Sequence, residues 1–60
     1  MQITLAQQMD YIDNCVIRFQ QGKLEAITAI FRIESMVSLV PKLSEHAQLA
    51  INDIRQAIVI

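Results

Sequence analysis

Two carboxylates, Asp10 and Asp13, are the first residues of this sequence that could do chemistry. They are three residues apart, with Asn14 beside the second, and on a helix this spacing puts both carboxylates on one face. Such a pair can share a metal ion or divide the roles of general acid and base. No Glu or His recurs nearby at helical spacing, so we interpret the pair as part of a solvated helix face.

The chain has one cysteine, Cys15, and one histidine, His46. A Cys-His nucleophile pair also needs a group that orients the histidine and donors for an oxyanion. One Cys and one His cannot complete a four-ligand zinc site, and a single glycine, Gly22, excludes a glycine-rich phosphate loop. The sequence therefore predicts no enzyme and no catalytic, metal, cofactor or small-molecule site. We expect Cys15 to be buried and His46 to lie at the surface.

Basic residues are few and scattered. The chain has five Lys and Arg residues and six Asp and Glu residues, so its net charge is -1, and its isoelectric point is about 5.6. Nucleic-acid-binding domains commonly have an isoelectric point above about 9 and a clustered basic face. The slightly acidic charge balance of this chain therefore disfavours a nucleic-acid partner. A small helical regulator whose basic residues converge only when it dimerises remains the alternative.

The elements that position these residues are marked by single breakers, Gly22 and Pro41, which divide the chain into three stretches of comparable length. Apolar residues at spacings of four and three predict a first helix over 4–21. Thr4 and Gln7 match a capping box, and Gly22 can take the left-handed conformation that closes the helix. The periodic apolar positions are Leu5, Met9, Ile12, Val16 and Phe19.

The stretch 24–40 is apolar around most of its helical circumference. Its β-branched residues make a strand the rival interpretation, but the stretch has no polar alternation and no hairpin signal. A helix that is apolar nearly all round has to be covered on more than one side, so we expect the central helix of the fold, the helix of a dimer, or both. Pro41 disfavours a helical conformation at Val40 and should end the element there.

A third helix is expected over 44–59, with Ser44 as its N-cap and Glu45 in its first turn. Its apolar stripe contains Ala47, Ile51, Ile54 and Ile58. Together the three stretches predict one all-α module over residues 1–60. It is either a small three-helix bundle or a helical hairpin with a third helix, and we expect it to associate through its apolar central helix.

Length and composition predict association. A chain of 60 residues buries only about 60% of the surface that its unfolded form exposes, yet 53% of this chain is hydrophobic. Charged residues interrupt every apolar stretch, so we expect no membrane span. The opening residues show no signal-peptide pattern, and we expect a cytoplasmic or otherwise intracellular protein.

The predicted function is non-enzymatic protein-protein interaction or self-association, as in a small adaptor, regulator or assembly domain. Glu34 lies within the apolar arc of the second helix and should need a salt bridge to Arg18, Arg32 or Arg55, either within the chain or across a dimer. The apolar end at Ile60 has no cap, which suggests docking to a partner or a structural piece of a larger polyprotein. The predicted interface contains Ile30, Phe31, Ile33, Glu34, Met36, Val37, Leu39, Ile58 and Ile60.

In length and helical periodicity the chain is similar to small dimeric helical regulators and to short secretion chaperones. The run from Phe19 to Lys23, followed by Ala26 and Ile30, resembles a helix-turn-helix junction in mobile-element polyproteins. The first resemblance rests on length and periodicity and implies helices that pair with a partner. The second covers about a dozen residues, and neither assigns a site residue.

Overall fold

The computed structural model describes residues 3–58, and its first helix, α1 (Leu5–Gln20), begins at the predicted cap. The Gln7 backbone N–H donates to the Thr4 hydroxyl oxygen at 3.1 Å, and the Thr4 backbone N–H donates to the Gln7 side-chain oxygen at 2.9 Å. Each residue thus satisfies a backbone donor of the other, which confirms the capping box.

The end of α1 is closed by Gly22, whose φ of 76° lies in the left-handed region. The Lys23 N–H donates to the Arg18 carbonyl at 2.9 Å, and the Gly22 N–H donates to the Phe19 carbonyl at 3.0 Å. This pair of bonds is the Schellman arrangement, which satisfies carbonyls that a helix end would otherwise leave open. The predicted role of Gly22 is confirmed, and the chain reverses here toward the second helix.

Helix α2 (Ala26–Leu39) starts two residues later than expected, because Glu25 is still extended, with φ of -71° and ψ of 151°. It ends before Val40, whose φ of -134° and ψ of 86° are the non-helical conformation favoured ahead of a proline. The expected effect of Pro41 is therefore confirmed.

A short 3-10 helix, η1 (Pro41–Leu43), leads directly into α3 (Ser44–Ile58). Ser44 is itself helical, with φ of -55° and ψ of -47°. The prediction that Ser44 is an N-cap is wrong, since an N-cap needs an extended residue and η1 leaves none between the two elements. Helix α3 otherwise covers the predicted stretch as far as the described residues extend.

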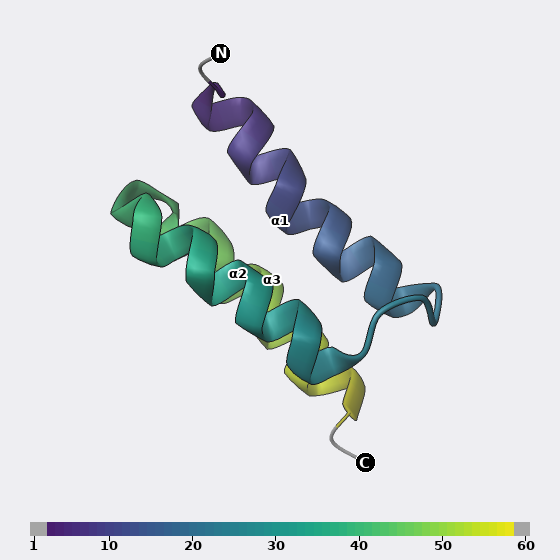
Figure 1. Cartoon of the computed structure of the whole chain (residues 1–60). Coiled ribbons are helices and arrows are strands. Elements are labelled where there is room, and N and C mark those ends of the chain that lie inside the picture. Colours follow the sequence, from purple (N-terminus) through teal and green to yellow (C-terminus); the bar gives the residue numbers. More distant parts are fainter. Residues whose placement is uncertain (1–2, 59–60) are drawn as a thin grey trace.

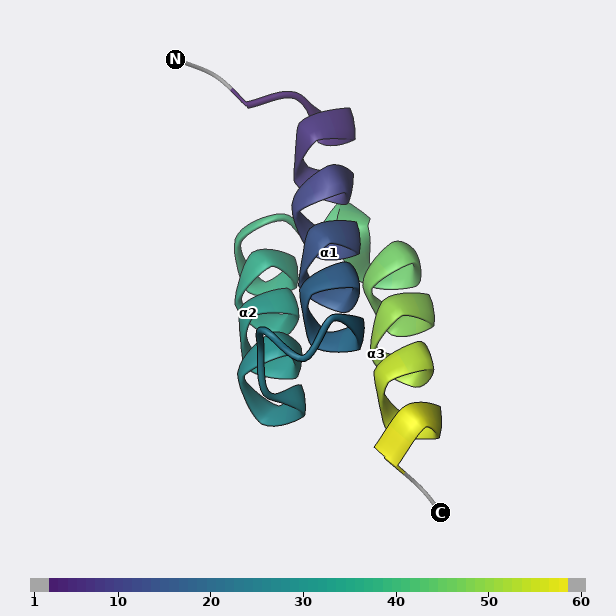
Figure 2. The ribbon, with the colours of Figure 1, turned by 90° about the vertical axis from the view of Figure 1, so that its right-hand side faces the viewer.

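The three helices form a bundle in which each helix contacts the other two. Helices α1 and α3 run in one direction and α2 runs in the other (Figures 1 and 2). Figure 2 shows the first turns of α1 extending beyond the neighbouring end of α2. The predicted all-α three-helix bundle is confirmed. Within residues 3–58, no helix combines the length and the apolar character needed to cross a membrane.

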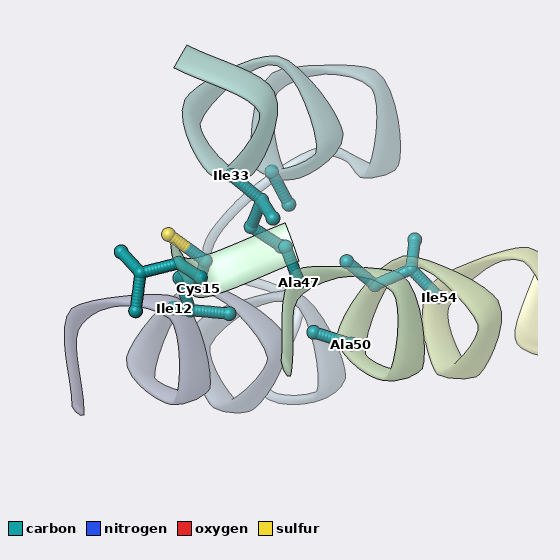
Figure 3. Close-up of a cluster of buried hydrophobic side chains, with 8 residues drawn as sticks. Ile12, Cys15, Ile33, Ala47, Ala50 and Ile54 are labelled. Atoms are coloured by element: carbon teal, nitrogen blue, oxygen red, sulfur yellow. The ribbon is translucent and has the colours of Figure 1, made fainter. Parts of the chain in front are cut away.

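The core is small, and side chains from all three helices and η1 build it (Figure 3). Four large side chains are fully buried, Ile12 from α1, Ile33 from α2, Leu43 from η1 and Ile54 from α3. The remaining buried residues are one cysteine and three alanines: Cys15, Ala29, Ala47 and Ala50. The fully buried residues of α2 are Ala29 and Ile33, so α1 and α3 cover one face of it and α2 is not central within the chain.

Candidate interaction surfaces

The outer face of α2 carries large apolar side chains that the bundle does not cover. Phe31 is 69% exposed and Leu39 is 80% exposed, as a surface available for an interface requires. Ile27, one helical turn before Phe31, is 75% exposed and was not among the predicted interface residues. We call Ile27, Phe31 and Leu39 the α2 stripe. Their spacings of four and eight residues keep them on one side of the helix.

Ile33, predicted as an interface residue, lies in the core with no exposed surface. It faces inward between α1 and α3, so it cannot meet a partner while the bundle is folded, and its assignment to the interface is wrong. Three other predicted residues, Ile30, Met36 and Val37, are half-buried and pack against the core. Each of the three leaves part of its surface open.

Glu34 is exposed to solvent and forms no ion pair within the described residues. It lines a shallow groove between α2 and α3 that also contains Arg55, one of its three predicted partners. The predicted salt bridge within one chain is therefore absent here, and a solvated carboxylate does not require one. Ile58, at the end of α3, is 51% exposed. Ile60 lies outside the described residues.

A polar contact joins α1 to α3. His46 Nε2 donates to Asp13 Oδ1 at 2.8 Å, and both side chains are partly exposed. The sequence reasoning placed both residues at the surface but did not pair them, because 33 positions separate them and no spacing rule relates them. Within residues 3–58, Asp10 and Asp13 belong to no group of three or more His, Cys, Asp or Glu side chains that could hold a metal ion.

Cys15 is buried, as predicted. The histidine considered as its partner, His46, is hydrogen-bonded to Asp13. Burial raises the pKa of the Cys15 thiol, while the positive charges of Arg32 and Arg18 oppose that rise. The thiol is therefore neutral near pH 7 and packs as a small apolar side chain.

The two arginines define a small pocket of about 150 Å³ between α1 and α2. Arg18 comes from α1 and Arg32 from α2, so the fold brings together two cations that are far apart in the sequence. Tyr11 and Asn14 complete the polar part of its lining. We call this feature the arginine pocket; the sequence reasoning treated the basic residues as scattered and missed it.

A larger groove of about 470 Å³ lies farther along the same two helices, beside the first turns of α1. Leu39 and Ile3, 80% and 60% exposed, are its most open apolar members. We call it the apolar groove. Its lining consists of Ile3, Gln7, Gln8 and Tyr11 on the α1 side, and of Met36, Leu39 and Val40 on the α2 side.

Comparison with known protein families, characterised proteins and solved structures finds no match to this chain. Its function is therefore argued from these surfaces. Of the predicted interface residues within 3–58, the bundle exposes Phe31, Glu34, Leu39 and Ile58 and fully buries Ile33.

Proposed function

We propose that this chain is a non-enzymatic protein-interaction module that associates with a second copy of itself through the α2 stripe. The observation that supports the proposal most directly is the exposure of Ile27, Phe31 and Leu39, each more than two thirds open. Proteins that act alone rarely leave large apolar side chains grouped on one face, and such groups are typical of interaction sites.

Ser35 and Ser38 lie on the same side of α2 as the stripe, and the Ser35 hydroxyl is hydrogen-bonded within the helix. Ser35, four residues after Phe31, donates its hydroxyl to the Phe31 backbone carbonyl at 2.9 Å. The hydroxyl is thereby satisfied inside its own helix and does not need a partner from water or from a neighbouring molecule. The stripe can pack against an apolar surface without leaving that group unpaired.

The small core argues that the partner is a second copy. Half of the eight buried residues are alanine or cysteine, so little apolar area is removed from water inside one chain. Chains of about this length commonly gain the missing stability from disulfides, metals or association. The single cysteine forms no disulfide within the chain. Association through α2 would cover the stripe and add to the stability of both copies.

The test is sedimentation equilibrium over a concentration series, comparing the native chain with Phe31→Glu. We expect the native chain to approach the mass of two chains. The variant should keep the mass of one chain, because a buried unpaired carboxylate is costly. Circular dichroism should remain helical, since Phe31 makes little contact within its own bundle.

Leu49→Glu is the matched control, because Leu49 on α3 is 68% exposed and the substitution is the same. It should associate like the native chain. If Phe31→Glu and Leu49→Glu lost self-association equally, the native chain would associate through unspecific hydrophobic contact, which would contradict the proposal. A native chain that has the mass of one chain at every concentration would overturn the proposal.

A further inference from the structure

The arginine pocket and the apolar groove adjoin along the boundary between α1 and α2, and we call the two together the seam. Tyr11 lines both of them. On α1, Gln7, Tyr11, Asn14 and Arg18 follow one another at spacings of four, three and four, which keeps them on one face of the helix. The seam thus has an apolar end beside the first turns of α1 and a cationic end near its last turn.

The cationic end has no partner within the bundle. Neither Arg18 nor Arg32 forms an ion pair within residues 3–58, and no carboxylate lines the pocket. Both side chains line the same pocket together with Cys15, so their positive charges converge on one site between α1 and α2. Tyr11 and Asn14 add neutral polar groups, whose O–H and N–H can also donate. An arriving carboxylate would relieve the repulsion between the two arginines and accept hydrogen bonds from both.

The apolar end suits a large aliphatic side chain. Met36 and Leu39 supply an adaptable apolar wall, and methionine fills irregular space readily. The first turns of α1, which carry Gln7 and Gln8 of this end, extend beyond the neighbouring end of α2 (Figure 2). Gln7 and Gln8 lie at the edge of the apolar groove and can hydrogen-bond the backbone or side chains of a bound segment.

Spacing along α1 defines the shape of the occupant. Seven residues separate Tyr11 from Arg18, which is about 10 Å or two helical turns. A helix lying in the seam would therefore present apolar side chains to the groove and a carboxylate about two turns farther along the same face. Helix-in-groove recognition uses anchors with this type of spacing.

We propose that the seam between α1 and α2 binds an amphipathic helical segment of a different protein, whose carboxylate sits between Arg18 and Arg32 while its aliphatic side chains fill the apolar groove. The seam shares Leu39 with the α2 stripe, which a second copy covers under the proposed function, and otherwise lies apart from it. A chain that does not self-associate can therefore still bind the segment.

The test uses alanine-based helical peptides with two leucines one turn apart and a glutamate two turns beyond them, made with the glutamate toward either end. Fluorescence anisotropy measures their binding to the full chain. One orientation should bind, and the matched peptide with glutamine should bind about tenfold more weakly or worse, because hydrogen bonds to a charged group are the stronger ones. Added salt should weaken the glutamate peptide more than the glutamine peptide.

Protein variants locate the binding. Arg18→Gln and Arg32→Gln should each bind the glutamate peptide about tenfold more weakly than the native chain does. Arg55→Gln, on α3, should bind it as the native chain does. Phe31→Glu should also bind normally even if it no longer associates, which separates this inference from the proposed function. Equal binding of the two peptides, or equal loss in Arg55→Gln, would overturn the proposal. Binding that survives replacement of both leucines by alanine, or displacement by acetate or inorganic phosphate alone, would show only an anion site and overturn it as well.

Discussion

The two faces of α2 carry similar side chains in opposite surroundings. On the inner face, Ile33 and Ala29 have no exposed surface, whereas on the outer face Ile27 is 75% exposed and Phe31 is 69% exposed. The hydrophobicity of a helix therefore indicates how much apolar surface has to be removed from water. It does not indicate which part of that surface is covered by the helix's own bundle. In this bundle α1 and α3 cover one face only, and the other face is exposed.

The first way to break this comparison is to make the same substitution on each face. Ile33→Ala removes a fully buried side chain and should cost about 2–5 kcal/mol of unfolding free energy. A core this small supplies at most about 3–5 kcal/mol, so the variant should be largely unfolded at 25 °C. Urea unfolding followed by circular dichroism, at a concentration where the chain does not associate, measures the loss.

Ile27→Ala is the control and should change the same free energy by no more than about 0.5 kcal/mol. At high concentration its cost should grow, because association then contributes to the stability of the native chain by mass action. Equal losses at low concentration would show that the two faces of α2 are not differently covered.

The inner and outer faces of α2 could not be distinguished from the sequence. For the first helix a single apolar stripe indicated both the element and its buried side, and Ile12 is buried as that stripe requires. In the second helix apolar residues occupy most of the circumference, so the spacing predicted a helix without saying which side faces inward. Ile33 was therefore assigned to the interface and Ile27 was omitted.

The seam between α1 and α2 was beyond sequence reasoning for a different reason. Gln7, Tyr11 and Asn14 have the periodicity of a solvated helix face, and nothing in the sequence indicates that α2 lies beside them. Arg18 and Arg32 meet only because the turn at Gly22 reverses the chain. Local signals such as caps and helix breakers were sufficient to predict where the helices lie. The seam depends on contacts between two helices, which no local signal reports.

A second variant changes how α2 is joined to α1 without touching either of its faces. Gly22→Ala places a side chain on a residue with φ of 76°, and its Cβ would meet nothing within 4 Å, so the cost is backbone strain alone. We expect a loss of about 1–2 kcal/mol in unfolding free energy. The strain lies in the turn before α2 and changes neither of its faces. The fraction of folded chains that associate should therefore equal that of the native chain.

Gly22→Asn is the control, because asparagine tolerates the left-handed conformation better than alanine. It should lose less than Gly22→Ala in the same urea experiment. A loss in Gly22→Asn as large as in Gly22→Ala would contradict backbone strain as the cause.

A third variant removes the polar contact between α1 and α3 and so tests whether the covered side of α2 depends on it. Asp13→Asn weakens the hydrogen bond from His46, which is 2.8 Å long and partly exposed. Exposed pairs contribute at most about 1 kcal/mol, so the loss should be below that value and smaller still at high salt. Asp10→Asn, one helical turn earlier with no such contact, should cost nothing measurable. A larger loss would mean that the packing of α3 on α1 depends on this bond more than on Ala47 and Ile54.

The smallest effect concerns thiol chemistry on the two sides of α2. Burial raises the pKa of the Cys15 thiol, which belongs to the core cluster with Ile33. Its proton is therefore lost at higher pH than in the unfolded chain, and alkylation by iodoacetamide should need a higher pH than for an exposed thiol. In Ile27→Cys, peptide mapping should show the new thiol on the outer face reacting first at pH 8.

Arg32→Gln removes a positive charge that lowers the pKa of the Cys15 thiol, so the pH at which that thiol is alkylated should rise further. A downward movement would contradict the convergence of Arg32 on Cys15 and, with it, the cationic end of the seam.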